Sequence, residues 1–290
     1  MTKNKKCKVC SSLITVRDAY FTALSRFSFL SETDIKILLS HINNIPFNEL
    51  ALHFEDGAKN IDRFFALCEK VNDGYPLQYL LKESEFLGVD FYVNERVLIP
   101  RGETEELVVF MTELIKNENI KDAVIADICT GSGVIGLSLK KALPSSRVVL
   151  SDISNSALEV ASINSEKLNL NVDILHGSSL KPLVEKGIKI DYLVANPPYV
   201  NSDDEVGRSV KEYEPALALF SDDKQVYKDI FKDLEKVMRS DTISLMLEIN
   251  EKDGKLMLEL ASLILGPTSN AKIVKDIHGK DRFIFMRYTK

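Results

Sequence analysis

The chain has 290 residues, enough for one large domain or for a large and a small domain with a substantial core. Hydrophobic residues make up 45% of it and charged residues 28%, which is ordinary for a soluble globular protein. The formal net charge of -6 argues against a protein whose main partner is bare nucleic acid, because such proteins usually carry a basic excess or a basic face.

The chain starts with a basic stretch, residues 1–6, that no apolar signal-peptide segment directly follows. Cys7 and Cys10 have the spacing of a zinc or redox pair, but a second ligand pair is not evident, so a flexible basic tail is the favoured interpretation. The four cysteines are scattered in a chain too large to depend on disulfides, and no stretch approaches the length of a membrane span. We therefore expect a reduced, cytoplasmic protein with no membrane contact and no bound metal.

Residues 1–81 are predicted to form a small helical bundle, because short segments of helical periodicity alternate with short polar loops. Ser31 is the clearest expected N-cap, since acidic residues fill the helical turn after it. Pro46 suits the first turn of a short helix, and residues 62–71 are predicted to form another. No residue in this segment has the pattern of a catalytic group.

Residues 82–100 are predicted to form a β-hairpin linker, because two β-prone runs flank Gly88. Pro100 and Gly102 then interrupt the chain, and an acidic first turn opens a helix that runs to about residue 115. We place the domain boundary across this hairpin, so that residues 101–290 form the second domain.

From residue 123 onward, predicted strands and helices alternate, which indicates an α/β fold with a parallel sheet and helices on both faces. The last two β-prone runs are close enough to pair antiparallel across Gly279. The expected strands are 124–128, 147–150, 172–175, 190–195, 242–247, 271–274 and 282–288, and the expected helices are 134–141, 154–168, 224–237 and 252–264.

A glycine-rich motif, Asp127-Ile128-Cys129-Thr130-Gly131-Ser132-Gly133, lies where the first of these strands gives way to a helix. Its glycines permit a tight turn and a close approach of backbone to a ligand, and Gly136 completes a Gly-x-Gly-x-x-Gly spacing that is weak alone. Asp152 ends the next strand, where an acid accepts the ribose hydroxyls of an adenosine-containing cofactor. The alternative is a plain glycine turn beside a helix-capping aspartate.

The tetrapeptide Asn196-Pro197-Pro198-Tyr199 ends the fourth strand, at the edge where open parallel sheets place their ligands. Asn196 offers an amide, Pro197 a carbonyl without a competing N–H, and Tyr199 a flat ring. Together these groups suit a planar –NH2 group, although an isolated tetrapeptide of this kind is equally typical of a turn that ends a strand.

The glycine motif, Asp152 and the tetrapeptide together resemble class I S-adenosylmethionine-dependent methyltransferases that act on a planar –NH2 group, whose substrates include DNA adenine, some RNA guanines and protein glutamine. Longer stretches are similar to the release factor glutamine methyltransferase family (HemK or PrmC type) and span the chain from the helical segment to the terminus. They are 76–79, 85–88, 97–105, 213–220 and 279–282. The resemblance implies a Rossmann-like, seven-stranded methyltransferase sheet with a terminal antiparallel hairpin.

The family methylates the side-chain amide nitrogen of the glutamine in the Gly-Gly-Gln motif of peptide chain release factors. By this resemblance, Asn196, Pro197 and Tyr199 are the expected catalytic residues, and the substrate contacts add Pro198, Arg101 and Glu103. Ser178 stands where the family usually has an acidic residue near the adenine, and Gly102 replaces a usual proline. The expected S-adenosylmethionine contacts are Asp127, Cys129, Thr130, Gly131, Ser132, Gly133, Asp152, Ile153, Ser178, Ser179 and Asn196.

Two rival functions stay open. A relative modifying a glutamine of a ribosomal protein would have the same pocket chemistry. A nucleic-acid amino-methyltransferase (adenine N6 or guanine N2) would use the same tetrapeptide, but the acidic charge and the helical front segment argue against it. A binding module without activity does not account for the complete set of motif residues. If the partner is a release factor, residues 1–81 are the expected docking surface, and no direct nucleic acid contact is expected.

Overall fold

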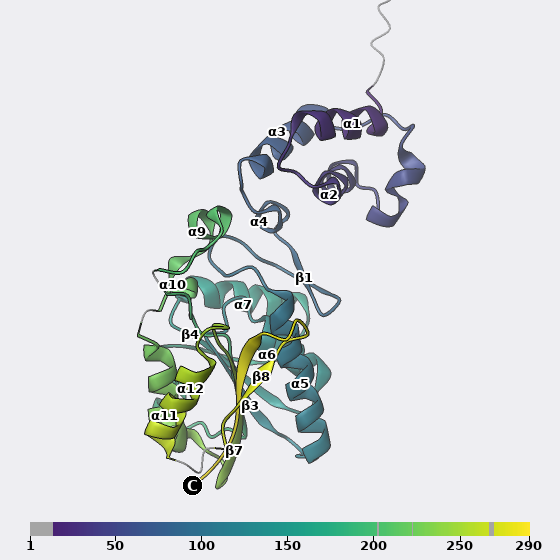
Figure 1. The fold of residues 1–290 in the computed structure, drawn as a ribbon. Helices are drawn as coiled ribbons and strands as arrows, with labels where there is room; N and C mark the ends of the chain where they lie inside the picture. Colours follow the sequence, from purple (N-terminus) through teal and green to yellow (C-terminus); the bar gives the residue numbers. More distant parts are fainter. Residues whose placement is uncertain (1–13, 202, 222, 267–269) are drawn as a thin grey trace, which may run out of the picture. The chain divides into compact units, whose positions relative to one another are not determined.

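The computed structural model of the protein describes residues 14–201, 203–221, 223–266 and 270–290 (Figure 1). The chain divides into two compact units, Met1–Leu81 and Lys82–Lys290, and each is described here by itself. Cys7 and Cys10, discussed above as a metal or redox pair, lie outside the described residues.

The first unit is helical and has its own hydrophobic core. Both of its first two helices begin with a capping box, in which Thr15 or Ser31 exchanges hydrogen bonds with an aspartate three residues later, so the predicted Ser31 cap is confirmed. Pro46 immediately precedes a 3-10 helix, and Phe64 is fully buried among the aliphatic side chains of the core. The elements are α1 (Val16–Arg26), α2 (Glu32–Asn43), η1 (Phe47–His53), α3 (Ile61–Asn72) and α4 (Leu77–Leu81).

The second unit begins with the predicted hairpin, which is formed by the antiparallel strands β1 (Ser84–Phe86) and β2 (Val89–Phe91). Leu87 and Gly88 make the turn, both with positive φ. Phe86 and Phe91 are 1% exposed and join the core between the large sheet and α5 (Gly102–Glu118). The hairpin is therefore packed into the second unit.

The large sheet has seven strands in the order β5-β4-β3-β6-β7-β9-β8. Strands β3 to β7 pair in parallel, whereas β9 is antiparallel to both β7 and β8. This confirms the predicted α/β fold with a terminal antiparallel hairpin. The strands are β3 (Val124–Ile128), β4 (Arg147–Asp152), β5 (Asp173–His176), β6 (Tyr192–Ala195), β7 (Thr242–Glu248), β8 (Lys272–Lys275) and β9 (Asp281–Thr289).

Helices cover both faces of this sheet (Figure 1). One core contains side chains of α5, α6 (Val134–Ala142) and α7 (Asn155–Lys167). The opposite core contains side chains of α8 (Lys181–Glu185), α11 (Gln225–Val237) and α12 (Gly254–Leu265). The sequence did not predict the four shortest helices, α4, α8, α9 (Arg208–Tyr213) and α10 (Ala216–Leu219), because segments of four to six residues are too short to show helical periodicity.

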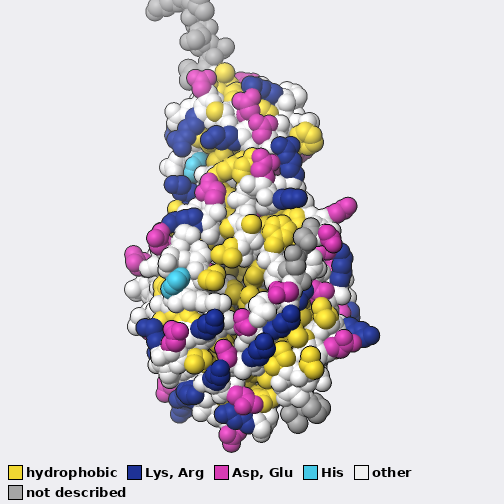
Figure 2. Space-filling model, turned by 90° about the vertical axis from the view of Figure 1, so that its left-hand side faces the viewer, with side chains coloured by type: hydrophobic (Ala, Val, Ile, Leu, Met, Phe, Trp, Pro, Cys, Tyr) yellow, Lys and Arg dark blue, Asp and Glu magenta, His cyan; other side chains and the backbone are white. Residues whose placement is uncertain are grey.

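On the face shown in Figure 2, acidic and basic side chains are interspersed, with hydrophobic side chains between them. This mixture agrees with the modest net charge of the chain. In the described ranges, we find no helix with the length and apolar content that spanning a membrane requires.

Gly136 in α6 is predicted to be required for packing against β4. A Cβ at this position would lie 2.2 Å from Leu150 Cδ2 and 3.0 Å from Asp127 Oδ2, both of them buried. Because those neighbours have little room to move, we expect Gly136→Ala to lower the free energy of unfolding by about 1–3 kcal/mol, despite the better helix propensity of alanine. Urea unfolding measures this. The control is Gly207→Ala, where an added Cβ meets nothing within 4 Å; an equal loss in both variants would contradict the packing argument.

Candidate active site

A cavity opens at the carboxyl ends of three neighbouring strands of the large sheet. Strand β3 pairs in parallel with β4 and with β6, in a register that sets Ile128 beside both Ser151 and Ala195. The residues that follow these strands therefore lie side by side, as expected for an open parallel sheet. The glycine motif, Asp152 and Asn196 all contribute residues to the cavity wall.

The glycine motif forms a tight loop between β3 and α6. Cys129, Gly131 and Gly133 have positive φ values of 58°, 55° and 85°, and Gly133 is the N-cap of α6. A Cβ on Gly131 would meet nothing within 4 Å, so its backbone conformation alone favours glycine there. The turn leaves Thr130, Gly131 and Ser132 at the cavity wall.

Asp127 supports this loop from behind. Its Oδ2 atom accepts hydrogen bonds from Thr130 Oγ1 at 2.5 Å and from the Gly136 amide at 2.9 Å. The side chain is 0% exposed and does not line the cavity, although the sequence predicted a cofactor contact. Burial raises the pKa of the Asp127 carboxyl to about 7, in spite of these two hydrogen bonds.

Asp152 lies at the cavity wall and is tied to the backbone on both sides. Its Oδ2 accepts from the Gly131 amide and its Oδ1 from the Ser154 amide, each at 2.9 Å. Burial raises the pKa of this carboxyl, whereas the backbone hydrogen bonds lower it. Since a carboxylate has about four acceptor sites, the backbone hydrogen bonds do not use all of them, and acceptor capacity is left for a ligand hydroxyl. Ile153, half exposed, offers an apolar surface beside it.

The loop after β5 contributes a second polar wall. Ser178 and Ser179 both line the cavity, and Ser179 has a φ of 53°. The Ser179 hydroxyl is buried and has no hydrogen-bond partner among the described residues. An unpaired buried hydroxyl beside a cavity is a group that a ligand can satisfy.

Only some residues of the tetrapeptide Asn196–Tyr199 line the cavity. Asn196 and Pro198 line the cavity, whereas Pro197 and Tyr199 do not. The Tyr199 hydroxyl donates to Glu248 Oε1 at 3.0 Å, and the Asn196 Nδ2 donates to Thr104 Oγ1 at 3.3 Å.

Arg101 lines the cavity and is fixed by a buried acid. Its Nη2 atom lies 2.6 Å from Glu214 Oε1, and Glu214 Oε2 accepts from the Ile99 amide at 3.1 Å. The side chain of Glu214 is only 2% exposed. This ion pair joins the segment before α5 to the segment after α9. Residues that follow Glu214, namely Pro215, Leu217 and Ala218, form an apolar part of the wall.

The structure thus brings most of the predicted site residues to one cavity. Those that line it are Arg101, Cys129, Thr130, Gly131, Ser132, Asp152, Ile153, Ser178, Ser179, Asn196 and Pro198. Those that do not line it are Glu103, Asp127, Gly133, Pro197 and Tyr199.

Sequence reasoning missed four buried polar residues that hold the loops of the site. Thr104 and Glu248 contact the tetrapeptide as described above, and Lys224 donates to the Tyr199 carbonyl at 2.8 Å. Asn164 in α7 donates to the carbonyls of Ser132 and Tyr92 and accepts from the Tyr92 amide. Only Glu248 had a usable signal, because it ends a strand at the edge where the site lies.

Comparison with known proteins identifies the family. A family model described as methyltransferase small domain matches residues 107–213. The release factor glutamine methyltransferase of Staphylococcus aureus (strain NCTC 8325 / PS 47) is 36% identical over 248 residues, which are 83% of this chain and 86% of the relative. That of Bacillus subtilis (strain 168) is 34% identical over 274 residues, which are 92% and 93% of the two chains. The chain belongs to the release factor glutamine methyltransferase family.

This membership confirms the resemblance stated from the motifs and makes the protein a methyltransferase. Among solved structures, the catalytic domain of hMettl16 in complex with MAT2A 3'UTR hairpin 6 matches with a TM-score of 0.52 at 15% identity. The match covers 78% of this chain and 80% of that one. At this identity the likeness shows the fold alone.

The raised pKa of Asp127 predicts a pH dependence of stability in this methyltransferase. The folded state holds the carboxyl proton up to a pH of about 7, whereas the unfolded chain releases it at about 3.9. The stability gained from the neutral form is therefore complete below the unfolded pKa and is lost as the pH rises through 7. Asp127→Asn stays neutral, so the melting temperature of wild type should fall relative to this variant between about pH 4 and pH 7 and should change little above that range. A constant difference would contradict the assignment.

Proposed function

We propose that the protein transfers a methyl group from S-adenosylmethionine to the side-chain amide nitrogen of the glutamine in the Gly-Gly-Gln motif of a peptide chain release factor. One observation supports this proposal most directly. Asn196 and Pro198, which suit a planar amide, share a cavity wall with Gly131 and Asp152, which suit an adenosine-containing cofactor. The relatives in the same family carry the corresponding name.

The residues of the cavity fit S-adenosylmethionine. The free acceptor sites of the Asp152 carboxylate suit the ribose hydroxyls, and the unpaired Ser179 hydroxyl is a donor or acceptor for the adenine. Ile153 supplies an apolar surface for a flat ring, and the open backbone around Gly131 admits the amino-acid part. When bound, the cofactor supplies a methyl group that is already activated on a sulfonium.

The substrate amide requires orientation more than a strong base. Its nitrogen is a poor nucleophile because its lone pair is delocalised into the carbonyl. In our proposal, Asn196 Oδ1 accepts an N–H group of the substrate amide and thereby holds the nitrogen in line with the methyl group, whereas Pro197, which does not line the cavity, is not assigned a substrate contact. Transfer would break the bond between the methyl group and the sulfonium, and the methylated nitrogen would lose one proton to solvent, because a neutral amide oxygen is too weak a base to keep it. Apolar Pro198, Pro215 and Leu217 exclude water from this contact.

Three further residues act around this contact in the proposal. Tyr199 does not line the cavity, and in the proposal it holds the loop that carries Asn196, with its hydroxyl donating to Glu248. Arg101, fixed by Glu214, contacts the substrate backbone at the cavity wall. Glu103 follows in the first turn of α5 and contributes negative charge close to Glu248 rather than a direct contact with the substrate.

The first unit is proposed to dock the release factor. The cavity can contact only a few residues of the release factor around one glutamine. Affinity for the whole protein therefore has to come from another surface. In the described part of this unit, Phe29 and Leu52 are 84% and 82% exposed, although such large apolar side chains favour burial. The unit keeps a hydrophobic core of its own, so these two residues are not needed for its stability.

Asn196→Ala tests the proposed site. Removing the acceptor for the substrate amide should lower kcat by about 100-fold, in the range measured when one positioned hydrogen-bonding group is lost from an active site. The dissociation constant of S-adenosylmethionine should stay within about threefold, because the ribose and adenine contacts are unchanged. Single-turnover transfer to a purified release factor and calorimetry measure the two quantities. Unchanged turnover in the variant would remove Asn196 from the mechanism.

The docking proposal predicts a change confined to substrate affinity. Phe29→Ser combined with Leu52→Ser should raise KM for the whole release factor by about 30-fold or more, since each of the two side chains contributes about 1–2 kcal/mol when its apolar surface is buried at an interface. The value of kcat should not change. Leu263→Ser is the matched control, since Leu263 is 82% exposed in α12 of the second unit. An equal increase of KM in the control, or none in the double variant, would contradict docking by the first unit.

A further inference from the structure

Glu248 is a buried carboxylate at the end of β7, beside the site rather than in it. Its side chain is 1% exposed, and each of its oxygens has one hydroxyl partner. Thr104 Oγ1 donates to Oε2 at 2.7 Å, and the Tyr199 hydroxyl donates to Oε1 at 3.0 Å. Glu248 does not line the cavity, so a direct contact with a substrate is not its role.

The hydroxyl of Thr104 connects this carboxylate to Asn196. A threonine hydroxyl has one hydrogen and two lone pairs. Since its hydrogen is directed to Glu248, only a lone pair is left for the second partner, and that partner must be a donor. Asn196 Nδ2 is the donor, at 3.3 Å. The contact therefore selects one of the two orientations of the Asn196 amide, which differ by exchange of the nitrogen and the oxygen.

The selected orientation has a chemical consequence. With Nδ2 directed to Thr104, the Asn196 Oδ1 is left on the other side of the amide as a hydrogen-bond acceptor. An –NH2 group has two hydrogens to donate and needs acceptors. The opposite orientation would present an NH2 group of Asn196 to the NH2 group of the substrate, and the two would repel.

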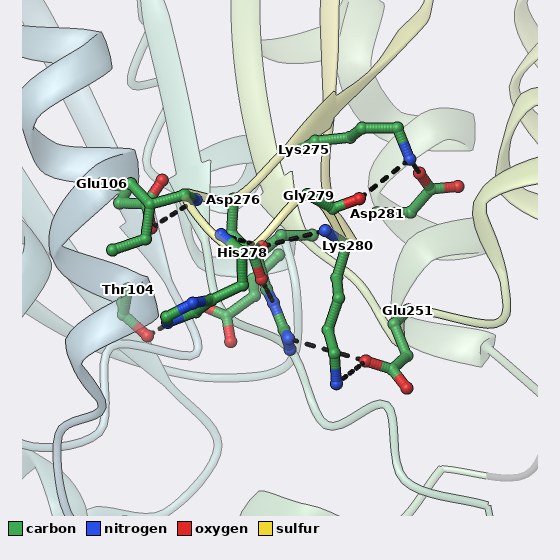
Figure 3. A network of polar contacts seen from close by, with 12 residues as sticks. Thr104, Glu106, Glu251, Lys275, Asp276, His278, Gly279, Lys280 and Asp281 are labelled. Carbon is green, nitrogen blue, oxygen red and sulfur yellow. Dashed lines mark hydrogen bonds and ion pairs between the residues drawn. The ribbon is translucent and has the colours of Figure 1, made fainter.

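The surroundings hold Glu248 and Thr104 in place. Burial raises the pKa of Glu248, whereas the two hydroxyl donors and the charge of Arg282 favour its ionised form; nearby Glu103 opposes ionisation. Arg282 is itself held by Asp276, in the turn of the terminal hairpin, and by Glu251, in the loop between β7 and α12. Figure 3 shows Thr104 on the first turn of α5 near this turn, and the Ile277 amide donates to Glu106 of the same helix at 3.2 Å.

We propose that Glu248 and Thr104 are positioning residues that fix the Asn196 amide with its oxygen toward the substrate, and that Glu248 also holds Tyr199 in the same loop. This inference rests on the proposed function. It adds to that function the residues that make Asn196 present its oxygen to the substrate –NH2 group. The Glu248 carboxylate thus fixes the side chains of both Asn196, through Thr104, and Tyr199. These are the two residues of the tetrapeptide whose side chains form hydrogen bonds. This role accounts for a buried acid that the transfer reaction itself does not require.

Thr104→Val and Thr104→Ser form the matched pair of variants. Valine keeps the shape of threonine but removes the hydroxyl, so kcat should fall by about 10- to 100-fold through loss of orientation. Serine keeps the hydroxyl and should retain kcat within about threefold of wild type. The KM for the release factor and the affinity for S-adenosylmethionine should change little in either variant. Thr112→Val makes the same substitution on α5 at a buried hydroxyl that has no hydrogen-bond partner in the described part of the chain, and it should leave kcat unchanged.

A second measurement does not depend on activity. The side-chain amide protons of Asn196, observed by nuclear magnetic resonance, should be shifted and should exchange faster with water in Thr104→Val, and should be unchanged in Thr112→Val. Glu248→Gln is the second variant if Thr104→Val does not fold. A glutamine offers only one acceptor oxygen for two hydroxyls, so kcat should fall while cofactor affinity is retained.

The outcomes separate the inference from the proposed function. If wild type methylates the release factor and Thr104→Val has the same kcat, the positioning role is wrong and the function stands. If wild type does not methylate it, the proposed function fails, and the Asn196 amide signals decide the positioning role by themselves. Unchanged signals in Thr104→Val would then overturn it.

Discussion

The parallel pairing of β3 with β4 on one side and β6 on the other is the constraint on which the site depends. Its register brings the ends of three strands together, so the loops after them have to meet. The loop after β3 suits the amino-acid part of a cofactor, the loop after β4 suits a ribose, and the loop after β6 suits a planar amide. Groups that lie as far apart in the sequence as Cys129 and Pro198 thereby line one cavity, and strands β3 and β6 beneath it are buried on both faces.

Buried polar side chains hold these loops in a defined geometry. Asp127 supports the glycine loop, Glu214 fixes Arg101, and Glu248 holds Thr104 and Tyr199. Each is nearly inaccessible to water, where an unpaired polar group is costly, so each hydrogen bond is strongly favoured over its absence. A methyl transfer that relies on positioning needs such loops, because small displacements of the reacting atoms lower the rate greatly.

The sequence predicted the sheet and the cavity well, and the support of the cavity poorly. Alternation of strands and helices and the Asn-Pro-Pro-Tyr motif depend on local patterns, which one sequence contains. The contacts of Thr104 with Glu248 and of Asn164 with Tyr92 join residues 144 and 72 positions apart, and no local pattern encodes them. Asp127 is a similar case. Its place in the glycine motif suggests a cofactor contact, but the direction of its side chain depends on a hydrogen bond from the Gly136 amide, which the motif does not show.

The central claim is that the cavity methylates a glutamine amide of a release factor. Incubation of the protein with methyl-labelled S-adenosylmethionine and a purified release factor tests it, beside the same factor with the Gly-Gly-Gln glutamine replaced by glutamate. We predict label on the native factor, located by mass spectrometry on that glutamine, and none on the replaced factor, because glutamate has no amide nitrogen. Label on both factors, or on neither while the cofactor is bound, would contradict the account.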